Sequence, residues 1–576
     1  MGVPAWLFPS LHGYRRACLR GDLLAGLSVW AILIPEALAY ATIAGVPPVV
    51  GLYAAPPALV LYAAFGSSRL LIAGPMSATA ALSAATVADV ASGGNVLALT
   101  ITLALLTGAA ALLAGAARLG FLSNFISEPV VKGFIVGLAI IIIVSQLPVL
   151  LGLERGTGDI FAQLDHLIGD IPDTDTTSLA IGGSSLVALL ALRRWGRMLP
   201  AALIVVLASV VAVRVFGLAD DGIAIVGPIT GGLPSPGLPD VGLDEIRALI
   251  PGALGIMLVA FAEGLGAARG LSRGSGAEID PDRELLGLGA ANVGSGVFGG
   301  FVVNGSLSKT AVNVESGART QLSAIVVAAL AVVTLVLFTD VFEDLPEATL
   351  AAVVIFAVAD LVDVRALASY YRAVAGRSVA PFSLAARPDF VAAIAALGGV
   401  LVLGTLPGLF AGIAVSLVLL IYRASRPHIA RLGLAPGSTQ YTDMGRHPEN
   451  VAPDGVVVLR VESPLFFANA QLVRQRIREA ALEPGIRAVV IDAETVPTID
   501  ITAAHMLHEL GEDLDREGVR LLLARDVSRV RDVLRRSLGP EAATLTHVFP
   551  TVAAAVDAAR SEGQPTQPMR VVPPAP

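Results

Sequence analysis

Residues 74–80 read GPMSATA and residues 305–311 read GSLSKTA, so both match the pattern GxxSxTA. The two copies are 231 residues apart, and each follows a short strand-like apolar run. A second pair of segments, 36–41 (EALAYA) and 263–268 (EGLGAA), shares the pattern ExLxxA at an offset of 227 residues. Two matched pairs at nearly the same offset indicate an internal repeat.

The composition indicates that lipid surrounds most of this chain. Of its 576 residues 55% are hydrophobic and 15% are charged, whereas soluble domains carry about 25% charged residues. The single cysteine, Cys18, excludes an internal disulfide. The net charge of −8 gives no sign of nucleic-acid binding, and no P-loop, nucleophile–base set or zinc spacing is present. We therefore expect neither an enzyme nor a cofactor or metal site.

Apolar runs predict a polytopic α-helical membrane protein, because a membrane helix needs about 20 apolar residues. Several runs are short or broken by Gly and Pro, the third and tenth most of all. The predicted spans are 22–42, 46–65, 74–92, 96–117, 125–147, 177–192, 198–216, 247–268, 284–300, 305–317, 320–339, 346–363, 388–405 and 407–423.

The loop charges support these fourteen spans. With the N-terminus in the cytoplasm, the cytoplasmic loops are rich in arginine and the opposite loops mainly hold acids. Examples are Arg69, Arg193, Arg194 and Arg319 on one side, and Asp159, Asp221 and Asp344 on the other. This positive-inside pattern predicts a multi-pass protein of the cell membrane with both termini in the cytoplasm.

The repeat contains seven spans, and an odd number requires the second copy to sit upside down in the membrane. Inverted repeats with broken helices are typical of transporters, whose substrate site lies near the midplane. Helix N-termini attract anions because they present unpaired N–H groups and a partial positive charge. The simpler alternative is that the small residues only permit close helix packing. We expect an anion site formed by Tyr40, Ser77, Ala78, Thr79, Ser306, Leu307, Ser308 and Lys309.

Three charged residues fall within the spans, where each costs ~2.5 kcal/mol or more at a helix centre. Glu36 and Glu263 are candidates for carrying a coupling proton or sodium ion, and Lys309 would attract the anion. Each also has a structural alternative. Glu36 could bond an unwound backbone, Glu263 could pair with Arg269, and Lys309 could be a fixed counter-ion to a glutamate.

A second domain begins near Gly455, where strand-like and helical segments start to alternate. This alternation predicts a cytoplasmic α/β domain with a largely parallel sheet. The expected organisation is a transmembrane domain at 1–430, a linker at 431–454, the α/β domain at 455–562 and a disordered tail at 563–576.

The first domain resembles the SulP family of sulfate-permease-type anion transporters. The stretches that carry the resemblance are 22–27 (DLLAGL), 34–41 (IPEALAYA), 44–48 (AGVPP), 51–53 (GLY), 66–69 (GSSR), 232–236 (GLPSP) and 305–313 (GSLSKTAVN). Two positions depart from the usual pattern: Glu36 replaces a glutamine and Lys309 replaces an arginine. The resemblance implies a seven-plus-seven inverted repeat with core and gate domains, a homodimer, and alternating access by a core that slides against its gate.

The C-terminal domain resembles a STAS domain, through 464–470 (PLFFANA) and 499–502 (IDIT). Thr502 aligns with the serine that is phosphorylated in soluble relatives, although a plain helix cap is the alternative role for this residue.

We therefore expect a secondary active transporter of sulfate, bicarbonate or a dicarboxylate, coupled to protons. An uncoupled exchanger or channel and a sodium-coupled bicarbonate transporter are the alternatives. The intramembrane carboxylates favour coupling, since a channel has no need of them.

Overall fold

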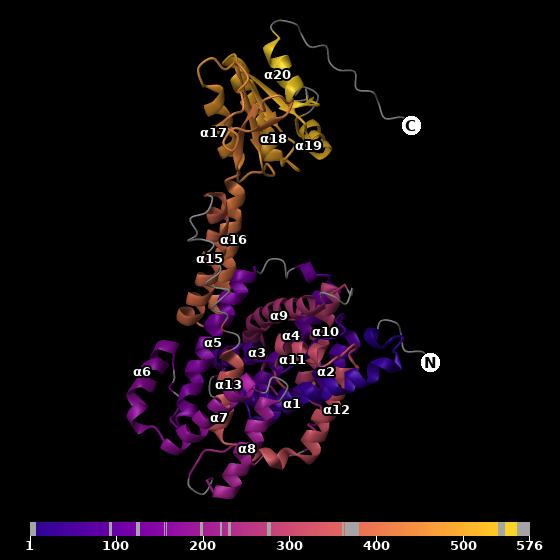
Figure 1. Ribbon diagram of the computed structural model, residues 1–576, viewed down its shortest axis with the longest axis vertical. Coiled ribbons are helices and arrows are strands. Elements are labelled where there is room, and N and C mark those ends of the chain that lie inside the picture. Colours follow the sequence, from indigo (N-terminus) through magenta and orange to yellow (C-terminus); the bar gives the residue numbers. More distant parts are fainter. Residues whose placement is uncertain are drawn as a thin grey trace. The chain divides into compact units, whose positions relative to one another are not determined.

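The computed structural model describes residues 7–561, except 92–94, 122–126, 155, 157, 196–199, 219–221, 229–231, 273–277, 360–361, 363–379 and 539–547. The predicted tail 563–576 and the end of the predicted span 346–363 lie outside the described residues. The chain divides into two compact units, Met1–Ser416 and Leu417–Pro576 (Figure 1).

The first unit is helical, and each of the fourteen predicted spans coincides with a helix among the described residues. The first-repeat helices are α1 (Leu19–Ile43), α2 (Val49–Phe65), α3 (Ser77–Val90), α4 (Val96–Ala116), α5 (Glu128–Leu150), α7 (Thr176–Trp195) and α8 (Ala201–Phe216). The second-repeat helices are α9 (Leu243–Ser272), α10 (Pro281–Val297), α11 (Leu307–Glu315), α12 (Leu322–Leu337), α13 (Glu347–Ala359), α15 (Ala380–Leu403) and α16 (Thr405–Ser425). A further short amphipathic helix, α6 (Ile160–Asp170), lies in a segment predicted to be a loop.

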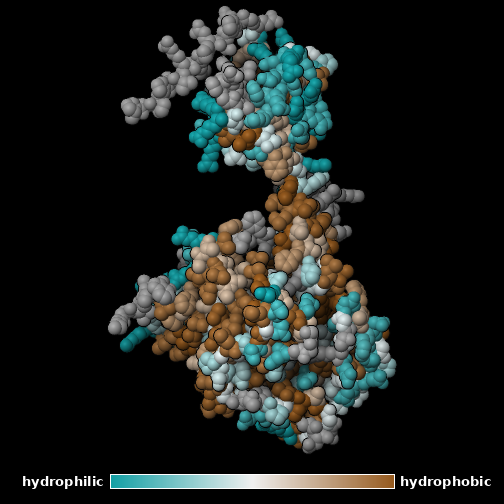
Figure 2. Space-filling view, turned by 180° about the vertical axis from the view of Figure 1, so that it is seen from behind, coloured by the Kyte–Doolittle hydropathy of each residue, from teal (hydrophilic) through white to brown (hydrophobic). Residues whose placement is uncertain are grey.

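The surface of this unit suits a bilayer. Six helical stretches among the described residues are long and apolar enough to cross a membrane: Arg16–Ile43, Val96–Ala116, Glu128–Leu150, Thr176–Arg194, Leu243–Gly270 and Pro407–Ser425. Five further apolar helices are shorter. Figure 2 shows extensive hydrophobic surface over this unit, whereas the C-terminal unit is mostly hydrophilic.

Small residues allow the helices of this unit to approach closely. A Cβ added to Gly108 of α4 would lie 2.6 Å from the backbone nitrogen of Val293 in α10. One added to Gly51 of α2 would lie only 1.9 Å from the carbonyl oxygen of Ala37 in α1. Glycine at these positions lets two helix backbones meet, as is typical of membrane helices.

The two broken helices meet through a short sheet. Strand β1 (Ile72–Gly74) precedes α3, and strand β2 (Asn304–Ser306) precedes α11. The strands pair antiparallel, with Ile72 opposite Ser306, Ala73 opposite Gly305 and Gly74 opposite Asn304. Each strand begins two or three residues after the start of the apolar run that precedes the motif. The antiparallel pairing of the strands suits two repeats of opposite orientation in the membrane.

The C-terminal unit contains a six-stranded sheet in the order β4-β3-β5-β6-β7-β8. Its strands are β3 (Ile429–Leu434), β4 (Tyr441–Asp443), β5 (Val456–Val461), β6 (Ala488–Asp492), β7 (Arg520–Ala524) and β8 (Val548–Phe549). Strands β5 to β8 are parallel, as predicted, but β3 and β4 join antiparallel. Strand β3 pairs with β5, and β4 pairs with β3, so residues of the segment 431–454 contribute to the edge of this sheet.

Helices cover both faces of this sheet. One core contains residues of α17 (Ala470–Ala481), α18 (Ile501–Arg516) and α19 (Ser528–Leu538), together with Val457 and Leu459 of β5. The other contains α20 (Val552–Arg560) with Val456 and Val458. Alternate residues of one buried strand thus face two cores, as the period of two in a strand requires.

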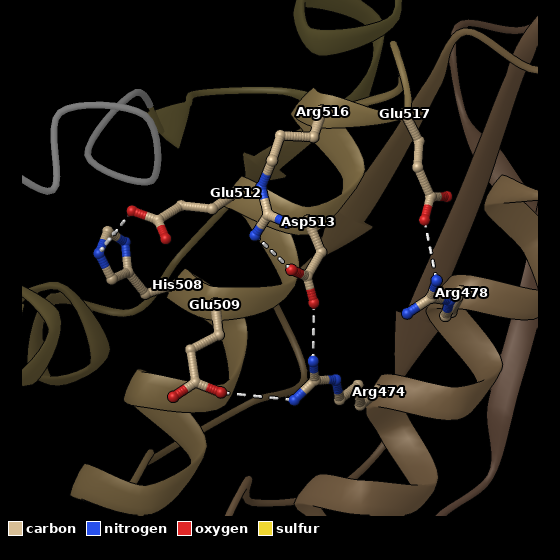
Figure 3. Close-up of polar contacts among 8 residues, drawn as sticks. All are labelled: Arg474, Arg478, His508, Glu509, Glu512, Asp513, Arg516 and Glu517. Atoms are coloured by element: carbon tan, nitrogen blue, oxygen red, sulfur yellow. Dashed lines mark hydrogen bonds and ion pairs between the residues drawn. The ribbon is translucent and has the colours of Figure 1, made fainter.

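Ion pairs link α17 to α18 on the solvent side (Figure 3). Arg474 of α17 lies 2.8 Å from Asp513 and 3.4 Å from Glu509, both on α18. Arg478 lies 2.8 Å from Glu517, the residue after α18. Because these side chains are partly exposed, we expect each pair to contribute little to stability.

Candidate functional site

The strand pair places the first turns of α3 and α11 beside each other. Helix α11 is capped by Ser306, whose hydroxyl oxygen accepts a hydrogen bond from the backbone N–H of Lys309. The Thr310 hydroxyl in turn accepts a hydrogen bond from the N–H of Ile72 at 3.0 Å, which fixes β1 to α11. Pro75 lies two residues before α3, which begins at Ser77. The strand pair therefore holds the N-termini of α3 and α11 beside each other.

The predicted residues of α3 are all buried. Ser77 is 3% exposed, and Ala78 and Thr79 are fully buried. The Thr79 hydroxyl donates to the carbonyl oxygen of Val302, just before β2, at 3.2 Å. This contact joins the two repeats, and Thr79 therefore holds the site together.

The predicted residues of α11 lie in two environments. Ser306 is buried, whereas Leu307 is 56% exposed and Ser308 is also exposed. The hydroxyls of Ser306 and Ser308 lie 3.2 Å apart. The exposed first turn of α11 can meet water or a ligand, while its cap stays buried.

Lys309 and Glu36 form the charged centre of this region. The Lys309 Nζ lies 2.6 Å from Glu36 Oε2, and the Lys309 side chain is only 1% exposed. Its Nζ also donates to the carbonyl oxygen of Pro75 at 3.2 Å and lies 5.0 Å from the centre of the Tyr40 ring. The counter-ion alternative for Lys309 is therefore realised, and Lys309 connects α11 to α1 and to the segment just before α3.

Glu263, on α9, contacts the first residue of β2. Its Oε2 accepts a hydrogen bond from the side-chain amide of Asn304 at 3.1 Å, whereas Oε1 is buried without a hydrogen-bond partner among the described residues. The contact to Asn304 replaces the ion pair with Arg269 that was the structural alternative. Asn304 was missed in the sequence, although a polar residue directly before the GxxSxTA motif is a signal that could have identified it.

A cleft of about 960 Å³ reaches this centre. Glu36 and Ser308 are among the residues that line it. Arg193 and Arg194 at the end of α7, and Glu315 at the end of α11, line it as well. The cleft therefore gives water and small solutes a route to the Glu36–Lys309 pair.

In the C-terminal unit, Thr502 is not the helix cap. The carboxylate of Asp500 accepts from the N–H of Ala503 and caps α18, so the cap alternative for Thr502 is wrong. Thr502 is the second residue of α18 and is exposed. Among the described residues, no three His, Cys, Asp or Glu side chains are grouped so that they could hold a metal ion.

Two family models match this chain. The model of the sulfate permease family matches residues 19–376, and the STAS domain model matches residues 447–555. The chain belongs to the sulfate permease family. As a family member it is a membrane transporter of anions and not an enzyme.

Its relatives include named sulfate transporters. A probable sulfate transporter of Mycobacterium tuberculosis is 37% identical over 551 residues, covering 95% of this chain and 96% of that protein. The chloroplastic sulfate transporter 4.1 of Arabidopsis thaliana is 32% identical, covering 90% of this chain and 76% of that protein.

Solved structures confirm the fold. Murine solute carrier 26 family member A9, an anion transporter solved in the inward-facing state, has a TM-score of 0.85 at 22% identity and covers 96% of this chain and 94% of its own. The transmembrane domain of the cyanobacterial bicarbonate transporter BicA has a TM-score of 0.58 at 24% identity, over 69% of this chain and 98% of its own. This sulfate permease family member thus has the predicted polytopic fold with a C-terminal STAS domain.

Proposed function

We propose that this family member is a secondary active transporter that moves a small oxyanion together with a proton, with Glu36 as the proton carrier. The observation that carries the proposal is the 2.6 Å contact between Glu36 and Lys309 at the paired N-termini of α3 and α11. The sulfate transporters among the relatives support sulfate as the first substrate to test. We further propose that the face bearing Arg193 and Arg194 is cytoplasmic, as the loop charges indicate.

The electrostatics explain how a proton and an anion would travel together. When Glu36 is ionised it neutralises Lys309, so only the two helix ends attract an anion, each with roughly +0.5 charge. Glu263 adds a negative charge nearby when it is ionised. Protonation of Glu36 leaves the ammonium of Lys309 uncompensated, which makes the site favourable for an anion. Loss of the proton restores the ion pair and favours release of the anion.

Alternating access completes the proposed cycle. The first turn of α11 and Glu36 meet the cleft, so the anion and the proton would enter and leave by the same route. A movement of the strand-linked half-helices against the remaining helices would then expose the site to the other side. The hydrogen bonds from Ile72 to Thr310 and from Thr79 to Val302 would move β1, α3, β2 and α11 as one body.

The test is uptake of labelled sulfate into proteoliposomes with and without an inward proton gradient. We expect the gradient to accelerate uptake by the wild type, and Glu36→Gln to remove this dependence while sulfate still binds. Glu128→Gln, which changes an exposed carboxylate paired with Lys132 on α5, is the matched control and should keep the dependence.

Other outcomes identify the alternatives. If Glu36→Gln keeps pH-driven accumulation, Glu263 is the carrier or the coupling ion is not a proton. Uptake that follows a sodium gradient instead indicates sodium coupling. A current that scales with voltage and ignores the pH gradient indicates a channel.

A further inference from the structure

Charged residues other than the Glu36–Lys309 pair also line the cleft. Glu36 is paired with Lys309, and among the described residues that line the cleft the other charged ones are Arg193, Arg194 and Glu315. These three side chains are exposed, and their formal charges sum to +1. The field of a net positive charge is focused in a cleft with low-dielectric walls, and it raises the local concentration of anions.

The two arginines are placed where an arriving anion would meet them. Both lie in the last turn of α7, and Ser308 on the first turn of α11 lines the same cleft. The Arg193 guanidinium lies 5.6 Å from the ring centre of Phe356 in α13, a stacking contact that orients the side chain. A guanidinium presents its donors in a planar fork that matches oxyanions.

We propose that Arg193 and Arg194 form a peripheral anion-capture site that favours divalent over monovalent anions on their way to the central site. This inference rests on the proposed function. It assigns to the cleft a selectivity for charge that adds to that of the helix ends and acts before the anion reaches them.

The preference for charge follows from electrostatics. The interaction energy scales with the charge of the anion, so an enrichment of about threefold for a monovalent anion becomes about ninefold for a divalent one. Salt weakens the effect, because the Debye length falls from about 8 Å at 0.15 M to about 3 Å at 1 M. A capture site on one side of the membrane also acts only on anions that arrive from that side.

The experiment measures competition from each face of the membrane in proteoliposomes. The transported probe is whichever labelled anion the wild type carries, and sulfate or nitrate is added as competitor at constant ionic strength. We expect Arg194→Gln to raise the half-inhibitory concentration of sulfate about ninefold and that of nitrate about threefold, from the arginine-bearing face only. At 1 M salt the half-inhibitory concentrations of the variant and the wild type should be the same.

Three further variants separate a capture site from damage to the fold. Arg194→Lys keeps the charge and should stay near wild type. Glu315→Gln removes a negative charge and should therefore lower the half-inhibitory concentration of sulfate. Arg247→Gln removes an exposed arginine, paired with Asp244 at the start of α9, and should change nothing from the arginine-bearing face.

The outcomes keep this inference separate from the proposed function. Three results would each overturn the capture site, provided that the wild type transports well. They are an equal change of the half-inhibitory concentrations of sulfate and nitrate in Arg194→Gln, a change measured from both faces, and no change at all. Failure of the wild type to transport any anion would instead overturn the proposed function.

Discussion

At the scale of single residues, the site depends on one lysine whose charge is already balanced. Lys309 is nearly inaccessible and contacts Glu36, the Pro75 carbonyl and the Tyr40 ring at once. A buried charge without a partner is costly, and the contact with Glu36 offsets part of the cost of burying Lys309. The two departures from the usual family pattern, Glu36 and Lys309, are thus partners in space.

Ala78 gives a direct test of the predicted anion position. It is fully buried in the first turn of α3, and we expect Ala78→Trp to abolish uptake because the indole would fill the space beside the helix N-terminus. Extra methylenes in a packed core cost about 1–3 kcal/mol and an indole adds more volume than that, so correct insertion of the variant is measured together with its uptake. Uptake and gel-filtration profiles of the purified variant provide the measurement.

The control for this prediction is Ala88→Trp, which adds the same side chain at an exposed position of α3 and should transport normally. An Ala78→Trp protein that inserts correctly and transports at the wild-type rate would place the anion elsewhere.

At the scale of elements, short strands and buried charges hold the important parts in position. In the membrane unit, β1 and β2 pair the two broken helices. In the C-terminal unit, the carboxylate of Asp492 at the end of β6 connects neighbouring strands. It is fully buried, and it accepts hydrogen bonds from Arg460 of β5 at 2.8 Å and from Arg525, just after β7, at 3.0 Å. The hydrogen bond from Arg525 to Asp492 raises the pKa of the Arg525 guanidinium above its usual value.

We expect Asp492→Ala to destabilise the C-terminal unit by about 3–5 kcal/mol, because it leaves two partly buried guanidinium groups without their shared carboxylate. Pulse proteolysis of the solubilised full chain in increasing urea would measure the loss. The matched control is Glu517→Ala, which breaks the partly exposed pair with Arg478 and should cost about 0–1 kcal/mol. Similar losses for the two variants would refute a structural role for Asp492.

At the scale of the whole molecule, the local patterns predicted the fold well. Hydropathy placed each of the fourteen spans on a helix, since lipid-facing helices must be apolar along their length. The GxxSxTA pair identified the half-helices, because in both repeats the motif lies where a short extended segment ends and a helix begins. The strands β3 and β4 were missed, since six- and three-residue strands beside a membrane helix carry little periodicity.

Contacts between distant segments were harder to predict. The sequence marked Glu36, Glu263 and Lys309 as costly charges, but it left open which glutamate would pair with the lysine. The answer depends on how α1 packs against α11, which no local pattern encodes. The same holds for Asn304, which contacts Glu263 across 41 residues of chain, and for Arg193 and Arg194, whose place in the cleft requires α7, α11 and α13 together.

The last prediction concerns the division of labour between the two units. Tyr40, Glu36, Lys309 and the rest of the candidate site all lie within Met1–Ser416, and none comes from the C-terminal unit. We therefore expect removal of residues 429–576 to lower expression or rate and to leave the ranking of transported anions unchanged. The cut precedes β3, because a cut after Leu434 would leave a strand without its partner β5.

Competition by sulfate, bicarbonate and a dicarboxylate against the labelled substrate measures this ranking in the full and shortened chains. The full-length Asp492→Ala protein is an independent control, since it loosens the C-terminal unit without removing it and should leave the ranking unchanged as well. A shortened chain that prefers a different anion would show that the C-terminal unit takes part in selection, because the residues around Lys309 are identical in both proteins.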